Sequence, residues 1–229
     1  MKSQALFLLA FLLTVAVQAQ QDCSIFYPFK EGVTLEYTNY NKKGKVEGST
    51  TSTVTTVEAS GDAALAKIST VIRDEKGKEQ FSGAYDVRCD NGTIIMDASN
   101  MVNPAMQQSL ANMEVSIEGT ELALPSTLTV GQELPDASTT IKAGSNGVTI
   151  INMTVNVTNR KVLSREELTT PAGTFNCYKI TQDTDVKMMI AKTMTSIDYY
   201  AEGVGMVRSE TYDKKGNLEG YTELTKFEK

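Results

Sequence analysis

Apolar and polar residues alternate one by one along most of the chain, which is the period of a β-strand with one buried face and one face in water. Near the start of the chain, Val33, Leu35 and Tyr37 alternate with polar residues. Further runs of this kind lie at residues 81–89, 151–157 and 178–180. Threonine is abundant beside Val, Ile and Tyr in these runs, and the mixture favours half-buried strands of an antiparallel sheet.

Short hairpin turns separate the strands. Several four-residue turns have Asn or Asp first and Gly fourth, the pattern of a type I turn that closes into a glycine bulge. These turns lie at residues 41–44, 74–77 and 213–216, and related turn signals occur at 90–92 and 170–173. We therefore expect an all-β fold of roughly ten to twelve strands. Its form would be a curved antiparallel meander sheet or an open (half) barrel.

One segment has the period of a helix instead. Residues 101–113 predict a single short helix, because Pro104 suits its first turn. Met106, Leu110 and Met113 would then share one face of that helix. We expect this face to cover one side of the curved sheet.

The start of the chain has the pattern of a secretory signal peptide over residues 1–19. Lys2 precedes an uncharged, mostly apolar run at residues 5–17, and small residues precede a cleavage site after Ala19. The run is shorter than the roughly 20 residues of a spanning helix. Lipid attachment at Cys23 is not expected, because the residues before it are not small. The sequence thus predicts a periplasmic or secreted protein with no transmembrane segment after signal removal.

The mature chain, residues 20–229, is expected to form a single β domain. Residues 124–147 are rich in Pro, Gly and Ser and are typical of a crossover or linker. Within that segment, residues 128–130 predict a short strand. We prefer one continuous domain because the strand patterns on the two sides are alike.

Composition excludes several chemistries. The chain contains no histidine, which excludes Ser-His-Asp and Cys-His catalysis and His-containing zinc sites. No phosphate-binding glycine loop occurs. The net charge of −6 argues against nucleic acid and against anionic membrane surfaces as partners. We therefore expect no enzyme, no catalytic residue, no cofactor and no metal. Paired carboxylates, such as Glu166 with Glu167 or Asp86 with Asp97, leave a hydrolase as a third interpretation.

Three cysteines allow one disulfide outside the cytoplasm, and three pairings are open. In a simple meander, the strand that starts after Gly32 and the strand that ends at Cys89 place Cys23 and Cys89 at the same end of the sheet. Cys23–Cys89 is therefore the candidate disulfide, with Cys177 left as a buried thiol.

A stripe of apolar side chains suggests a ligand site. Phe81, Tyr85 and Val87 share one face of their strand, and the apolar face of the expected helix would lie opposite. Mostly apolar cavities bind apolar ligands, whereas filling gaps in a closed core is the alternative role of the methionines. The candidate cavity residues are Phe81, Tyr85, Val87, Met96, Met106, Leu110 and Met113.

The chain contains one internal similarity. Residues 40–48 (YNKKGKVEG) resemble residues 212–220 (YDKKGNLEG). One interpretation is a motif present in two copies at the two ends of one sheet. The other is two hairpins that share good turn chemistry by convergence.

Several segments resemble a known group of proteins. They are residues 22–23 and 26–32 (DC and FYPFKEG), residues 170–180 (TPAGTFNCYKI) and residues 199–207 (YYAEGVGMV). Together they resemble the TapB-type secreted proteins of Bacteroidetes, relatives of a larger family of periplasmic β proteins of unknown function. The resemblance implies an extracytoplasmic all-β domain without a demonstrated reaction, and its motifs mark turns and strand bends. By analogy of fold, the chain is similar to the half-open barrels of periplasmic lipoprotein carriers.

These observations predict a non-catalytic protein outside the cytoplasm that binds an apolar small molecule or lipid in the concave face of its sheet. The alternative is a protein-interaction or structural envelope module that uses a sheet edge.

Overall fold

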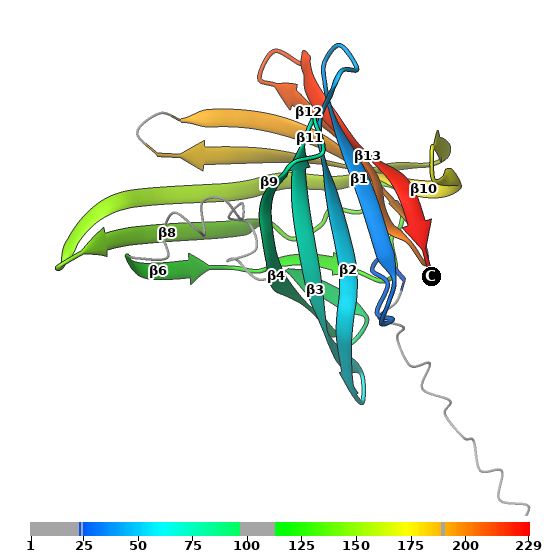
Figure 1. Ribbon diagram of the computed structural model, residues 1–229, viewed down its shortest axis with the longest axis horizontal. Helices are drawn as coiled ribbons and strands as arrows, with labels where there is room; N and C mark the ends of the chain where they lie inside the picture. The colour runs from blue at the N-terminus through cyan, green and yellow to red at the C-terminus, as the bar shows by residue number, and fades with distance from the viewer. Residues whose placement is uncertain (1–22, 24, 97–112, 189–190) are drawn as a thin grey trace, which may run out of the picture.

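One antiparallel sheet of 13 strands makes up the structure (Figure 1), a computed structural model that describes residues 23, 25–96, 113–188 and 191–229. Those residues contain no helix, and the expected all-β fold is confirmed. The strands are β1 (Thr34–Asn41), β2 (Val46–Ser60), β3 (Ala63–Asp74), β4 (Glu79–Asp90), β5 (Thr93–Met96), β6 (Glu114–Gly119), β7 (Leu122–Pro125), β8 (Ala137–Ser145), β9 (Val148–Thr170), β10 (Gly173–Lys187), β11 (Lys192–Ala201), β12 (Gly205–Asp213) and β13 (Leu218–Glu228).

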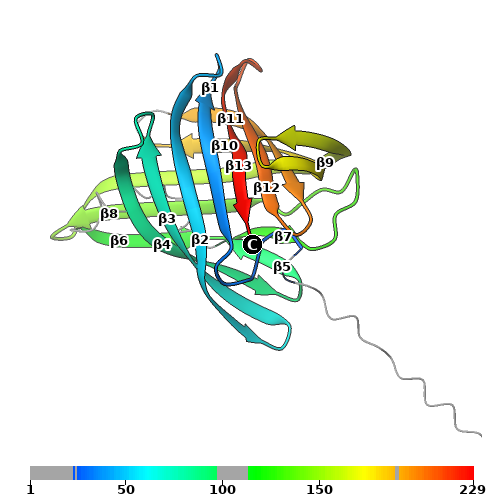
Figure 2. The same ribbon diagram turned by 45° about the vertical axis from the view of Figure 1, so that its right-hand side comes forward.

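The first and last strands of the chain are neighbours in the middle of this sheet. The strand order is β6-β8-β9-β10-β11-β12-β13-β1-β2-β3-β4-β5-β7. β1 pairs with β13 along its length, from Thr34 opposite Glu228 to Asn41 opposite Gly220. Two meanders, β8 to β13 and β1 to β5, are thereby joined into one curved surface (Figure 2).

The curved sheet is closed by the loop of residues 126–136, which follows β7, the strand at one end of the sheet order. This loop lies against β9 through backbone hydrogen bonds. Leu134 N donates to Arg160 O at 2.9 Å, and Val162 N donates to Gln132 O at 2.9 Å. We call this closed part the half-barrel. β6, β8 and the first half of β9 project away from it as a flap (Figure 1).

The expected crossover at residues 124–147 resolves into the end of β7, this loop and β8. The short strand predicted at residues 128–130 is wrong, because those residues form no strand. Leu128 and Leu134 are each 5% exposed. The loop buries both side chains in the core of the half-barrel, so its conformation follows from packing on the core together with a single bridge to β9, between Glu133 and Lys161.

A bulge gives β9 two different buried faces. Before it, the odd-numbered residues of 153–157 are buried and pack in the flap. Asn159 then adopts a left-handed conformation with φ of 55°, and the register with β10 shifts. Beyond the bulge the even-numbered Arg160 and Val162 are buried instead. Since a bulge inserts one unpaired residue, it reverses which side chains face inward.

The segment before β1 packs into the half-barrel, where Phe26 is 2% exposed in the main core cluster. A disulfide links Cys23 to Cys89, 66 residues away near the end of β4, and this is the pairing favoured in the sequence analysis. Cys177 is a buried, free thiol.

Two expected features lie outside the described residues: the signal peptide at 1–19 and, except for Met113, the helix at 101–113. Met113 is partly buried against the core cluster of the flap. In the part of the chain that the structure describes, no helix is long and apolar enough to cross a membrane.

Candidate functional site

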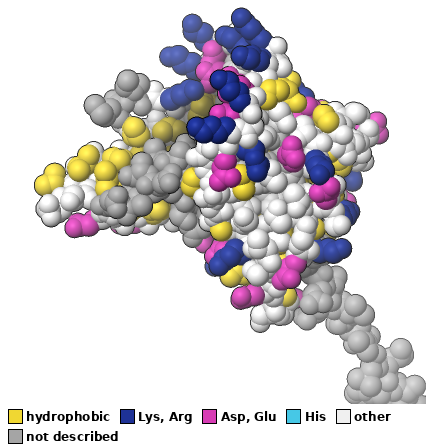
Figure 3. Space-filling view, viewed as in Figure 1, with side chains coloured by type: hydrophobic (Ala, Val, Ile, Leu, Met, Phe, Trp, Pro, Cys, Tyr) yellow, Lys and Arg dark blue, Asp and Glu magenta, His cyan; other side chains and the backbone are white. Residues whose placement is uncertain are grey.

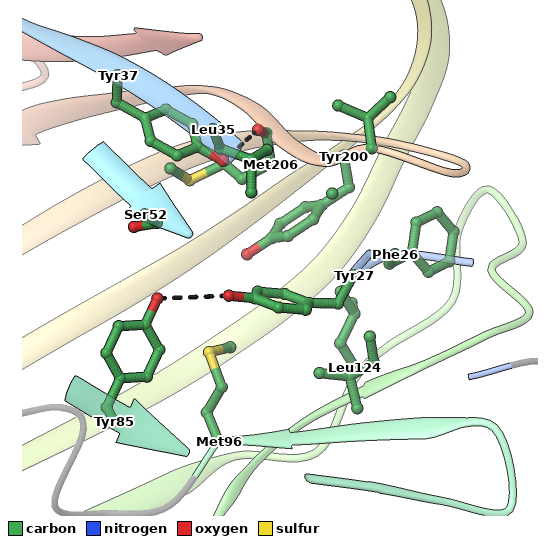
Figure 4. A pocket seen from close by; sticks show the side chains of 13 residues that line it. Phe26, Tyr27, Leu35, Tyr37, Ser52, Tyr85, Met96, Leu124, Tyr200 and Met206 are labelled. Atoms are coloured by element: carbon green, nitrogen blue, oxygen red, sulfur yellow. Dashed lines mark hydrogen bonds between the residues drawn. The ribbon is translucent and has the colours of Figure 1, made fainter. Parts of the chain in front are cut away.

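A cavity of about 180 Å³ lies inside the half-barrel (Figure 4). Its walls come from strands β1, β2, β4, β5, β7, β11 and β12 and from the segment before β1. The wall residues occupy inward-facing positions of neighbouring strands. Leu35 on β1 lies opposite Ser52 on β2, and Tyr200 on β11 lies opposite Met206 on β12. The aliphatic and thioether side chains of the lining are Leu35, Ile94, Met96, Leu124, Val204 and Met206.

Tyrosine hydroxyls supply most of the polar side-chain groups of the cavity, which we call the tyrosine cavity. Tyr27 and Tyr85 meet across it with their hydroxyl oxygens 3.4 Å apart, and Tyr37 donates to the carbonyl oxygen of Met206 at 3.0 Å. Burial raises the pKa of Tyr27, Tyr37 and Tyr200 above the ordinary tyrosine value. These hydroxyls therefore stay protonated at neutral pH and can both donate and accept a hydrogen bond.

Two polar side chains of the lining have no hydrogen-bond partner among the described residues. The hydroxyl of Tyr200 extends toward the space between Tyr27 and Tyr37 in Figure 4. Ser52 is only 6% exposed and also lines the cavity. Buried hydroxyl groups are nearly always hydrogen-bonded in folded proteins. No fully buried side-chain nitrogen or oxygen of the described residues lacks a partner, so these two hydroxyls are groups of the cavity wall and not unsatisfied groups sealed in the core.

The segment before β1 forms one wall and is held in place by close backbone contacts. Phe26 packs edge-on against Tyr178, with ring centroids 5.8 Å apart. Gly203 N donates to the carbonyl oxygen of Ile25 at 2.7 Å. Gly205 has φ of 102°, and a Cβ atom there would lie 3.1 Å from the backbone oxygen of Phe26. Only glycine fits that position without strain.

A buried polar network lies close to the cavity. Arg160 and Asp198, 4% and 6% exposed, are joined through Gln182, which accepts from Arg160 Nε at 3.2 Å and donates to Asp198 Oδ2 at 3.0 Å. Ser196 and Ser209 donate to the same carboxylate. Burial raises the pKa of Asp198, whereas these two serines and Arg160 oppose the rise.

Arg160 connects the loop of residues 126–136, which we call the closing loop, to the sheet. Its guanidinium donates to the carbonyl oxygens of Ala123 and Pro135 at 2.9 Å and 2.7 Å. Burial lowers the pKa of Arg160, and nearby Tyr200 and Asp198 raise it. The contacts of this network hold β7, β9, β10, β11 and β12 together, so the network accounts for how the half-barrel closes.

The carboxylates considered for a hydrolase do not gather at the cavity. Glu166 lies in an ion pair with Lys179 at 3.6 Å, and its side chain is 42% exposed. Glu167 follows it directly in β9, so the two side chains point to opposite faces of the sheet. Asp97 lies outside the described residues. Over the described ranges, no group of three or more Cys, Asp or Glu residues is arranged to hold a metal ion.

The structure brings only part of the predicted cavity set together. Tyr85 and Met96 line the cavity. Val87 is fully buried in the core cluster of the half-barrel, and the ring of Phe81 lies over Gly83 on its own strand. Of the remaining predicted residues, Met113 packs in the flap, and Met106 and Leu110 lie outside the described residues.

Sequence reasoning missed most of the lining, although a signal was present. Phe26 and Tyr27 belong to the FYPFKEG segment, and Tyr200 and Met206 belong to the YYAEGVGMV segment. Tyr178, from the third segment, packs against Phe26. The motifs that carried the family resemblance, interpreted above as turns and bends, therefore converge on one wall of the cavity.

Comparison with known proteins gives the family. A model described as DUF3108-like matches residues 30–224, which is most of the chain. The chain belongs to the DUF3108-like family. This match confirms the coarser part of the resemblance given above, which is membership of a family of β proteins. A search of the curated proteins found no match.

Two crystal structures share the fold of this DUF3108-like protein. One is a protein of Bacteroides fragilis described as exported and with a YmcC-like fold; it is 22% identical, with a TM-score of 0.72, covering 90% of this chain and 99% of that one. The other, from Parabacteroides distasonis, is described as a lipoprotein; it is 24% identical, with a TM-score of 0.71, covering 91% and 100%.

Proposed function

We propose that this DUF3108-like protein is a non-catalytic binding protein outside the cytoplasm, which holds an apolar group of a lipid-like ligand in the tyrosine cavity. The observation that carries the proposal is the hydroxyl of Tyr200, which extends into the cavity (Figure 4), together with the hydroxyl of Ser52 in the cavity wall; neither has a partner among the described residues. A ligand with an apolar body and one polar atom would fill the space and satisfy these hydroxyls.

The size of the cavity limits the bound group. Its volume of about 180 Å³ lies below the roughly 300–1,000 Å³ of pockets for drug-sized ligands. It lies slightly above the roughly 150 Å³ of an engineered cavity that binds benzene. A single ring or a short alkyl segment fits this space, and the rest of a larger amphiphile would extend beyond it.

A location outside the cytoplasm is part of the same proposal. The signal-peptide pattern of residues 1–19 and the Cys23–Cys89 disulfide support it, because disulfides persist in oxidising compartments. The two proteins of the same fold are described as exported and as a lipoprotein. The closer kinship with TapB-type secreted proteins also belongs to this proposal, and it rests on the three sequence segments that meet at the cavity.

Titration of an environment-sensitive fluorescent fatty acid into the exported, delipidated protein tests the proposal. We expect saturable binding by the wild type and none by Ser52→Leu, which fills the cavity. Tyr200→Phe should weaken binding roughly tenfold, the effect of about one lost hydrogen bond. Tyr199→Phe is the matched control, since it lies next in sequence on the opposite face of β11.

The proposal fails if the delipidated wild type binds no probe saturably. It also fails if Ser52→Leu, shown to be folded by circular dichroism, binds as tightly as the wild type. Equal losses in Tyr200→Phe and Tyr199→Phe would likewise argue against binding in the cavity.

A second candidate function, an interaction module that uses a sheet edge, is favoured by β6. This strand lies at one end of the sheet order, and all of its residues are exposed, with Val115 43% and Ile117 37% exposed. An extended peptide can add to such an edge as a further strand. Val115→Lys combined with Ile117→Lys should abolish crosslinking through this edge in the cell envelope and leave fatty-acid binding unchanged.

A further inference from the structure

The two similar segments of the chain lie side by side at one end of the sheet. The tip of the β1–β2 hairpin is at residues 41–45, and the tip of the β12–β13 hairpin is at 213–217. Because β1 pairs with β13, these hairpins are neighbours, at the top of Figure 1. Lys42 N donates to the carbonyl oxygen of Glu219 at 3.1 Å across the junction.

Turn geometry explains the Asn, Asp and Gly residues of these segments. Asn41 Oδ1 accepts from the backbone N of Lys43 and of Lys45, at 2.9 Å and 3.2 Å. Asp213 Oδ1 does the same for the second hairpin. Gly44 has φ of 73° and Gly216 has φ of 77°, a conformation that favours glycine.

Turn geometry does not require the lysines. The contacts within the turn use their backbone N–H groups, which nearly every residue type provides, and the positions between Asn or Asp and Gly accept most residues. Lys42, Lys43 and Lys45 of the first tip are exposed, as are Lys214 and Lys215 of the second. The fold of the two turns therefore does not explain why these side chains are positively charged.

This group of lysines, which we call the basic tips, forms no close ion pair with another described residue. No ion pair within 4 Å among the described residues includes any of the five side chains. Of the nearby carboxylates, Glu219 pairs with Lys192 at 2.9 Å, and Asp213 accepts hydrogen bonds from its own turn and interacts electrostatically with Lys215 alone of the five lysines. Figure 3 shows Lys and Arg side chains crowded at this end of the molecule.

The local charge differs in sign from the charge of the whole chain. A net charge of −6 argues against a general attraction to anionic surfaces. However, charges more than about 8 Å apart in water are largely screened at physiological ionic strength. A surface that contacts only the protruding tips therefore meets mainly lysine.

We propose that the basic tips dock the protein on an anionic lipid bilayer. Lysine ammonium groups are flexible point charges, which suit a surface of many headgroups better than the fixed geometry of one bound anion. The tips protrude from the end of the sheet (Figure 1), so several lysines can approach a flat surface together. Each lysine near such a surface strengthens binding about fivefold. This docking does not depend on the tyrosine cavity.

Sedimentation with vesicles tests the docking. The exported protein is mixed with vesicles of phosphatidylcholine alone, or of phosphatidylcholine with phosphatidylglycerol. We expect binding only to the second kind, and release as sodium chloride is raised, because salt screens the contact. Lys42→Gln with Lys43→Gln, and Lys214→Gln with Lys215→Gln, should each reduce binding at least tenfold.

The hairpin between β3 and β4 offers a matched control. Its turn has the same backbone contacts to Asp74, but Asp74, Glu75 and Glu79 lie beside its two lysines. Lys76→Gln with Lys78→Gln removes the same charge and should change vesicle binding less than threefold.

Three outcomes would overturn the docking proposal. The first is no sedimentation with anionic vesicles, and the second is an equal loss in the control variant. The third is binding to soluble polyphosphate with no binding to vesicles, which would indicate a dissolved polyanion as the partner. Fatty-acid binding in the cavity should be the same in all of these variants, so the two proposals fail separately.

Discussion

Replacing Arg160 by methionine should destabilise the fold by about 3–5 kcal/mol, the range for breaking a buried charged contact. The guanidinium donates to the carbonyl oxygens of Ala123 and Pro135 and to Gln182. Methionine keeps the apolar stem but donates nothing, so these buried acceptors lose their partner. Each hydrogen bond from a charged group contributes roughly 1.5–3 kcal/mol, and relaxation of the closing loop keeps the total below their sum.

The size of this effect should depend on pH because of Asp198. Burial raises the pKa of Asp198 and Arg160 opposes the rise, so the Arg160→Met variant should raise that pKa further. A carboxyl group whose pKa is higher in the folded state stabilises the fold while it is protonated, and this contribution is lost as pH rises through the folded-state pKa. The loss of unfolding free energy should therefore be smaller at about pH 4 than at about pH 7.

Urea unfolding followed by circular dichroism measures both quantities. Arg88→Met is a suitable control, because Arg88 is 51% exposed in a surface ion pair with Glu121; exposed pairs contribute about 0–1 kcal/mol. Asp198→Asn should recover part of the loss when combined with Arg160→Met. A loss below about 1 kcal/mol, or a loss that is the same at both pH values, would refute the assignment of Arg160 as the residue that closes the half-barrel.

Three further predictions concern covalent and backbone features. Replacing Cys23 and Cys89 by alanine should lower the free energy of unfolding by about 4 kcal/mol in the chain-entropy model, measured by urea unfolding; an unchanged midpoint would contradict it. Gly205→Ala should destabilise the fold by about 1–3 kcal/mol, because φ is 102° and the backbone of the segment before β1 is close; equal melting temperatures would exclude strain there. Burial raises the pKa of Cys177 to about 11, so its thiol should react with Ellman's reagent only on unfolding, and rapid reaction in the native protein would show that it is accessible.

The strands and their buried faces followed from the sequence because their signal is local. At the start of β1, the alternation of Val33, just before the strand, and Leu35 with polar residues matches their burial. The hairpin turn at Asn41 and Gly44 forms as its residues predict. A strand pattern needs only the difference between a dry and a wet face, and each residue contributes to it independently.

The tyrosine cavity could be predicted only in part, because distant segments form it. Tyr85 is predicted from the alternation of its own strand, but Tyr27 and Tyr200 reach the cavity through contacts between segments far apart in the chain. The bulge at Asn159 is equally hidden. It reverses the inward face in the middle of one continuous strand, and no glycine or proline marks the place. Local periodicity predicts one buried face for the whole strand, and Arg160 does not belong to that face.

The pairing of β1 with β13 has a consequence for how the chain folds. Contacts between residues nearly 200 positions apart, such as Thr34 with Glu228, are slow to form because a long loop must close first. Until the last strand reaches the sheet, β1 keeps one row of unpaired backbone groups, and such an open edge attracts other chains. We therefore expect the edge of β1 to be open to aggregation until β13 pairs with it, and a chaperone that shields this edge should raise the yield of folded molecules.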